Sequence, residues 1–183
     1  MTGVRALGAA LLAAAAASAA LAGGLRTDFG EQALAQEMAR RPVVLLGETN
    51  DNAAQHATRA AALRRLLAGG ARPAIAFEQF DRERQADIDR ARREAPPAGR
   101  TPAEHVMESA RPARGWDRSL YLPFVELALE YDVPIVAANL SRADAMRVAR
   151  QGFGAVFDDA TQQRFALDAL PPAPLAAPER AGD

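Results

Sequence analysis

Short apolar runs alternate along the chain with longer amphipathic segments. The first run, Val43 to Leu46, ends at Gly47 and is followed directly by polar residues. Such a run is typical of a parallel strand that is buried on both faces. The runs at 74–77 and 134–138 are predicted to be two further strands. The glycine after the first run permits a tight turn into the next element.

Helix signals fill the segments around these strands. Asn52 and Gln55 form a capping box at the start of one helix, and Gly69-Gly70 marks its end. Helices are predicted at 29–40, 53–68, 81–93, 101–110, 119–131, 141–152 and 161–170.

Strands that alternate with helices predict an α/β fold. We expect a parallel, or mostly parallel, sheet flanked by helices and joined by right-handed crossovers. Three strands are few for a sheet of this class. We therefore expect that the chain is incomplete or that the open edge is covered by something else.

Composition narrows the classes of function. The chain has 183 residues and a formal net charge of -1, which gives no reason to expect nucleic acid as a partner. The hydrophobic fraction of 49% is that of an ordinary globular protein. The absence of cysteine excludes disulfides, thiolate metal sites and a lipid anchor on an N-terminal cysteine.

The N-terminus has the pattern of a cleavable signal peptide. Arg5 precedes an apolar run that closes with Ala20-Leu21-Ala22, a small-x-small cleavage pattern. We expect residues 1–22 to be removed and the protein to be periplasmic or otherwise exported, located in the envelope; an uncleaved membrane helix is the alternative. Residues 23–170 should form one α/β domain, and the Pro- and Ala-rich residues 171–183 a disordered tail.

Polar side chains follow all the predicted strands. Glu48, Glu78 and Asn139 come at or just after the strand ends, and the carboxyl ends of parallel strands lie at one edge of a sheet. We therefore expect these three side chains to converge. His56 should lie near them, at the start of the inner face of helix 53–68. A core-margin histidine with no ligand is the alternative reading of His56.

The aromatic residues cluster in the middle of the chain. Trp116, Tyr121, Phe124 and Tyr131 are expected mostly to pack in the core. A loop tryptophan beside glycine can also line an apolar pocket for a flat ligand. The chain contains no phosphate loop, no G-x-G-x-x-G, no G-x-S-x-G and no H-E-x-x-H.

Three stretches are modest motifs alone but fairly specific in their order and spacing. They are Val-Val-Leu-Leu-Gly-Glu-x-x-Asp-Asn at 43–52 with His56 after it, Phe-Glu-Gln-Phe at 77–80 with Gln85 downstream, and Trp116 to Pro123 leading into 134–139. Together these stretches resemble the ChaN-like haem-binding uptake family, whose superfamily includes Tiki proteases, TraB proteins and erythromycin-esterase-like enzymes. The resemblance covers about residues 40–155. It implies an exported bacterial α/β protein that handles haem or iron.

The sequence departs from the family pattern at two positions. Asn50 stands where the family usually has a histidine, and Gln55 stands where a histidine often precedes His56. In the enzymatic relatives the first of these histidines is a metal ligand, and asparagine is a poor substitute for imidazole. The resemblance therefore implies no tightly held catalytic metal here. The chain is also shorter than the family norm at its C-terminal end.

These observations favour an exported haem- or iron-binding protein of the uptake type rather than an enzyme. A metal-dependent hydrolase and a truncated remnant without a ligand are the alternatives. Because so small a sheet would not enclose haem, we expect haem to bind between two chains and to promote a homodimer. The candidate ligand-binding residues are Gly47, Glu48, Asn50, Asp51, His56, Glu78, Trp116, Tyr121 and Asn139.

Overall fold

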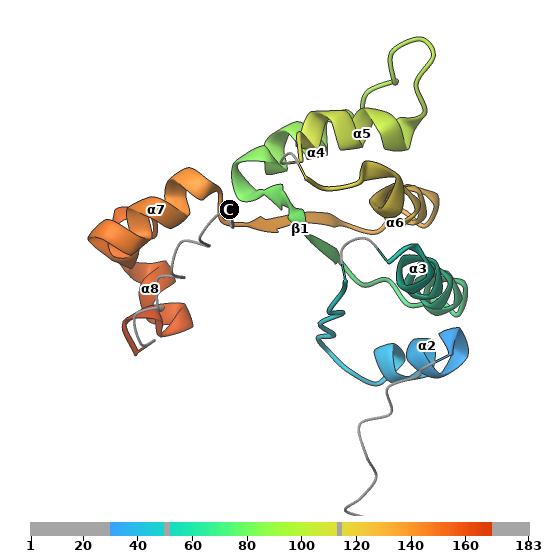
Figure 1. Cartoon of the computed structure of the whole chain (residues 1–183), viewed down its shortest axis with the longest axis horizontal. Helices are drawn as coiled ribbons and strands as arrows, with labels where there is room; N and C mark the ends of the chain where they lie inside the picture. The colour runs from blue at the N-terminus through green and yellow to red at the C-terminus, as the bar shows by residue number, and fades with distance from the viewer. Residues whose placement is uncertain (1–29, 50–51, 113–114, 170–183) are drawn as a thin grey trace, which may run out of the picture.

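The computed structural model describes residues 30–49, 52–112 and 115–169. Two parallel strands, β1 (Ile75–Asp81) and β2 (Ile135–Asn139), form the sheet in this part of the chain, and helices cover one face of it (Figure 1). The α-helices are α2 (Glu31–Ala39), α3 (Ala53–Ala68), α4 (Gln85–Ala91), α5 (Pro102–Ala110), α6 (Arg118–Glu130), α7 (Arg142–Gln151) and α8 (Asp159–Phe165). The predicted α/β class with a parallel sheet is confirmed.

Helices α3 and α5 begin where the local signals predict. The Asn52 side chain accepts a hydrogen bond from the backbone N–H of Gln55 and caps α3, and Gly69 is its C-cap. The predicted capping box is only half formed, because the Gln55 side chain accepts from the N–H of Thr49 rather than from that of Asn52. Thr101 makes the full capping box of α5 with Glu104. Each cap bonds backbone groups only a few residues away, so it does not depend on contacts with distant parts of the chain.

The charged stretch after β1 differs from the prediction of one helix over 81–93. Asp81 ends the strand, and its carboxylate accepts a hydrogen bond from the amide of Asn139 instead of capping a helix. A short 3-10 turn, Arg82–Arg84, therefore precedes α4. At the other end of the chain, the helix expected at 161–170 is α8 followed by a 3-10 turn, Leu167–Ala169.

The prediction of a strand at 43–46 is wrong. This segment is not part of the sheet, and the side chains of Val43 and Leu45 are 75% and 92% exposed. The carbonyls of Leu46 and Gly47 accept hydrogen bonds from the Arg59 guanidinium instead of from a neighbouring strand. An apolar run becomes a strand only when a ladder partner satisfies its backbone; no described strand pairs with 43–46, and Arg59 binds only the carbonyls at the end of the run.

The core lies on one face of the sheet. Figure 1 shows α4, α5 and α6 on the same side of the strands. Phe77 of β1 and Ile135 of β2 are buried together with side chains of these helices, such as Val125 and Leu127 of α6. On the predicted apolar face of α6, Leu127 and Ala128 are buried, whereas Phe124 and Tyr131 are half-buried.

The opposite face of the sheet is open in the described part of the chain. Its residues alternate with the buried ones: Ala76 and Glu78 on β1, and Val136 and Ala138 on β2, are all exposed. Helix α3 packs against α2 and α6 rather than against this face. The predicted signal peptide and tail lie outside the described residues. None of the described helices is both long enough and apolar enough to span a membrane.

Candidate functional site

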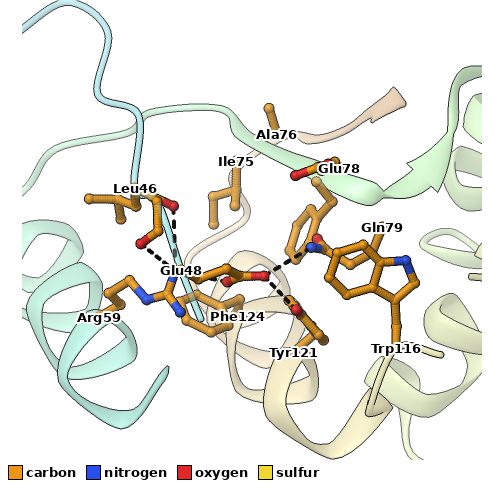
Figure 2. A pocket seen from close by; sticks show the side chains of 12 residues that line it. Leu46, Glu48, Arg59, Ile75, Ala76, Glu78, Gln79, Trp116, Tyr121 and Phe124 are labelled. Carbon is orange, nitrogen blue, oxygen red and sulfur yellow. Dashed lines mark hydrogen bonds and ion pairs between the residues drawn. The ribbon is translucent and has the colours of Figure 1, made fainter. Parts of the chain in front are cut away.

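A cavity of about 320 Å³ opens between the extended segment 46–48, strand β1 and helix α6 (Figure 2). One part of its wall is apolar and aromatic, and another part carries charged and polar side chains. The apolar lining is Leu46, Ile75, Ala76, Phe77, Trp116 and Phe124, and the polar lining is Glu48, Arg59, Glu78, Gln79 and Tyr121, with Gly47 beside Glu48.

Glu48 is the centre of the polar part. Its Oε1 accepts hydrogen bonds from the Tyr121 hydroxyl at 2.5 Å and the Gln79 amide at 3.4 Å. Its Oε2 lies 2.8 Å from Nη1 of Arg59 and 3.8 Å from Nε2 of His56. Figure 2 shows the carboxylate between Arg59 on one side and Tyr121 and Gln79 on the other. These contacts hold Glu48 in one orientation at the cavity.

Arg59 joins three parts of the site. It belongs to α3, is buried, and donates from Nε to the carbonyl of Gln55. Its Nη1 reaches Glu48 and the carbonyls of Leu46 and Gly47, so it fixes the segment that forms one wall of the cavity. We did not predict this residue from the sequence. The available signal was its position three residues after His56 and four before Leu63, on the inward face of the helix.

The phenol of Tyr121 is buried at the foot of the aromatic wall. Burial raises the pKa of Tyr121 above its ordinary value, and the hydrogen bond to Glu48 and the charge of that carboxylate raise it further. The side chain therefore stays protonated at neutral pH while no ligand replaces that proton. Tyr121 is thus a hydrogen-bond donor to Glu48 in the ligand-free protein.

The aromatic side chains around Tyr121 meet edge to face. The Trp116 and Tyr121 rings lie 5.6 Å apart between centroids, and the His56 and Tyr121 rings 4.9 Å apart. Trp116 is half-buried, so part of its ring remains open to the cavity. Tyr131 lies apart from this group, under the guanidinium of Arg72.

His56 lies close to Glu48, as predicted, but behind the cavity wall rather than in it. The residue is 3% exposed, and within the described ranges neither ring nitrogen has a hydrogen-bond partner. It is absent from the cavity lining, whereas Tyr121 and Phe124, which both pack on its ring, are part of it. His56 therefore packs behind Tyr121 and Glu48 and does not face the cavity itself.

The structure brings together most, but not all, of the predicted site residues. Gly47, Glu48, Glu78, Trp116 and Tyr121 line the cavity, although Glu78 makes no hydrogen bond or ion pair to a described residue. The sequence reasoning also missed Gln79, which is buried and bonded to Glu48. Asn50 and Asp51 lie outside the described residues.

Asn139 does not join the other predicted residues. It ends β2, and its amide donates to Asp81 at 2.6 Å. Of the three side chains expected to converge, Glu48 and Glu78 both line the cavity and only Asn139 does not. Asn139 lies opposite Asp81, because β1 continues past Glu78 to Asp81, and Asp81 binds its amide there. Among the residues that the structure describes, no three His, Cys, Asp or Glu side chains are grouped so as to hold a metal ion.

Comparison with known proteins gives one finding of similarity. The family described as haem-binding uptake, Tiki superfamily, ChaN matches residues 34–181, which include every residue of the cavity. Neither a curated protein nor a solved structure matches the chain.

Proposed function

We propose that this chain, which belongs to the ChaN-like family of haem-binding uptake proteins in the Tiki superfamily, binds haem in the cavity beside Glu48 and acts in haem or iron uptake. The observation that carries the proposal is the combination of an aromatic wall, Trp116 and Phe124, with the hydrogen-bonded pair of Tyr121 and Glu48 at its foot. Haem is a flat apolar disc with an iron at its centre, and a site for it needs apolar walls and a side chain that can bind the iron.

The residues of the cavity fit these requirements. Leu46, Ile75 and Phe77 add aliphatic and aromatic surface to the wall. Tyrosine is one of the side chains that hold haem iron in proteins, and Tyr121 lines the cavity. Haem bound here would supply an iron that can take an oxygen ligand from the protein. The Tyr121 oxygen is the ligand we assign to it, and the Glu48 carboxylate is the nearest acceptor for the proton of the phenol.

His56 has a different part in this proposal. Since it lies behind Glu48 and Tyr121 rather than in the cavity lining, we assign it no contact with the ligand. Its imidazole packs on Tyr121 and lies 3.8 Å from Glu48, so it positions both side chains.

We further propose that a second copy of the chain covers part of the bound haem. A volume of about 320 Å³ lies at the small end of the range for ligand pockets, about 300–1,000 Å³. One copy then covers only part of a ligand as large as haem, and a second copy covers the rest. Haem binding would therefore strengthen the dimer, and the affinity for haemin would rise with protein concentration.

The proposal also includes export. The apolar run after Arg5 supports export to the periplasm.

The test is a haemin titration of the purified chain, followed by the Soret band. We expect a shifted band that saturates, and a weaker or unshifted band for Tyr121→Phe. Tyr131→Phe is the matched control, because Tyr131 is the only other tyrosine and lies away from the cavity.

Two results would count against the proposal. A spectrum identical to that of free haemin at all protein concentrations would refute haem binding. A band shift that survives in Tyr121→Phe but disappears in His56→Gln would refute the assignment of Tyr121 and return His56 to the role of ligand.

A further inference from the structure

A second cavity lies between helices α4 and α5, apart from the cavity beside Glu48. Its volume of about 300 Å³ is at the lower end of the range for ligand pockets. The two helices pack against each other, and residues 92–101 connect them (Figure 1). The two cavities share no lining residue. A ligand between α4 and α5 would therefore be separate from the one proposed for the first cavity.

The lining of this second cavity is polar and charged. Six of its seven residues have polar side chains: Asp87 and Arg90 of α4, and His105, Glu108, Ser109 and Arg111 in and directly after α5. The seventh residue is Pro97. A flat apolar ligand would find no apolar wall here, so the lining suits a small polar molecule.

Both carboxylates of the lining are already paired with arginines. Asp87 lies 2.6 Å from Nη2 of Arg90 and 3.2 Å from Nη1 of Arg84. The hydrogen bonds from these two guanidinium groups hold the pKa of Asp87 below its ordinary value. Glu108 lies 2.8 Å from Nη2 of Arg100. The negative charges of the lining are therefore compensated, and neither carboxylate is left to attract a cation.

The groups that remain available are hydrogen-bond donors. Among the described residues, Arg111 forms no ion pair and the Ser109 hydroxyl has no hydrogen-bond partner. Nε2 of His105 is buried and also lacks a partner there, since the Glu94 carboxylate lies 4.0 Å away, beyond hydrogen-bond distance. Buried polar atoms normally have a partner. In the tautomer that carries its proton on Nε2, His105 would donate to an oxygen of a ligand.

Positive charge predominates around the cavity. Among the lining residues and their ion-pair partners in the described part of the chain, the arginines outnumber the carboxylates: Arg84, Arg90, Arg100 and Arg111 against Asp87, Glu94 and Glu108. The guanidinium fork of arginine matches the oxygens of carboxylate and phosphate groups. The excess of positive charge therefore favours an anionic ligand.

We propose that the cavity between α4 and α5 is a second binding site, and that it takes a small organic anion. A carboxylate or phosphate group of this ligand accepts hydrogen bonds from the Arg111 guanidinium, the Ser109 hydroxyl and Nε2 of His105. The volume of the cavity leaves room for the organic part of the molecule as well as for the anionic group. This site does not depend on haem, so its test is carried out without haemin.

The two histidines of the chain make the site visible by proton NMR. His105 lines this cavity, whereas His56 is buried behind the other one. The imidazole C–H signals of the full chain are assigned by comparison with His105→Gln. Inorganic phosphate, citrate and neutral glycerol are then titrated separately into the unmodified chain. The pH is held constant, and sodium chloride keeps the ionic strength constant.

We expect phosphate, citrate or both to move the His105 signal to saturation, with a dissociation constant of about 1 mM or tighter, and the His56 signal to stay in place. Glycerol should move neither signal. Arg111→Gln should weaken binding at least about tenfold, because a hydrogen bond to a charged group is lost. Ser109→Ala, which changes no charge, should weaken it by less. Arg93→Gln is the matched control, because Arg93 is an exposed arginine near the cavity but outside its lining.

Each result of these titrations bears on the proposal. Saturation by phosphate alone would support it with a phosphate-bearing ligand, and saturation by citrate alone would support it with a polycarboxylate. A His105 signal that neither anion moves to saturation would overturn the proposal. So would an affinity that Arg111→Gln leaves unchanged. Equal losses of affinity in Arg111→Gln and Arg93→Gln would also overturn it, because the anion would then respond to the net charge of the chain rather than to this cavity.

Discussion

Removal of the Arg59 guanidinium tests whether the polar centre of the site also holds the fold together. Arg59→Leu leaves Glu48 partly buried without its cation and frees the carbonyls of Leu46 and Gly47. Breaking a buried ion pair by removing one partner typically costs about 3–5 kcal/mol. Glu48 keeps its hydrogen bonds from Tyr121 and Gln79, so we expect a loss of about 3 kcal/mol in the free energy of unfolding.

Arg64→Leu is the matched control on the same helix. Arg64 pairs with Glu130 at 2.9 Å, but these side chains are 54% and 49% exposed. Exposed pairs contribute no more than about 1 kcal/mol. A third variant, Glu48→Gln combined with Arg59→Leu, leaves no uncompensated charge and should recover part of the loss.

Urea unfolding at pH 7 measures these differences. With a slope of about 2 kcal/mol per molar urea, Arg59→Leu should lower the midpoint by about 1.5 M, and Arg64→Leu by about 0.5 M or less. Equal shifts for the two single variants would refute the reasoning. The variant Glu48→Gln is also measured alone. A double variant whose midpoint falls by the sum of the shifts of Glu48→Gln and Arg59→Leu would likewise count against this expectation, because Glu48 and Arg59 would then act independently.

Further predictions concern Tyr121, Trp116 and the N-terminus. The folded-state pKa of Tyr121 lies above its ordinary value of 10, so its contribution to stability is complete below about pH 10 and is lost as the pH rises through the folded-state pKa. Urea midpoints measured against pH should therefore fall more steeply above pH 10 in the unmodified chain than in Tyr121→Phe, and parallel curves would contradict this. Trp116→Ala should weaken haemin binding while the urea midpoint changes little. An unchanged affinity for haemin would mean that Trp116 is not part of the binding site. Intact-mass measurement of protein from the envelope fraction should show cleavage after Ala22, and a full-length cytoplasmic product would end the proposal of export.

Local signals predicted the helices well. The caps at Asn52, Thr101 and Ser141 and the glycines at 69 and 152 act through backbone groups within a few residues, and each lies at a helix end in the structure. The parallel pairing of β1 with β2 also followed from the alternation of strands and helices. The fold class could therefore be predicted from the local sequence pattern and the general rules of sheet topology.

The errors at the site involve contacts between distant segments. The apolar run at 43–46 is typical of a strand, but pairing depends on a neighbouring strand, and Arg59 binds the carbonyls at the end of the run, those of Leu46 and Gly47. Gln79 and Arg59 were missed because only the folded chain shows that both point toward Glu48. Asn139 was placed in the site on the assumption that the first strand existed and that β1 ended at Phe77.

Binding of haem in the cavity beside Glu48 can be tested by the fluorescence of Trp116 in the unmodified chain and in a variant of the cavity. This is the only tryptophan of the chain, and haem bound in the cavity that it lines would quench its emission. Haemin is titrated into the unmodified chain and into Tyr121→Phe at equal protein concentration. We expect quenching that saturates at a fixed ratio of haemin to protein in the unmodified chain, and a clearly weaker affinity in the variant. Quenching that never saturates, or identical curves for the two proteins, would contradict it.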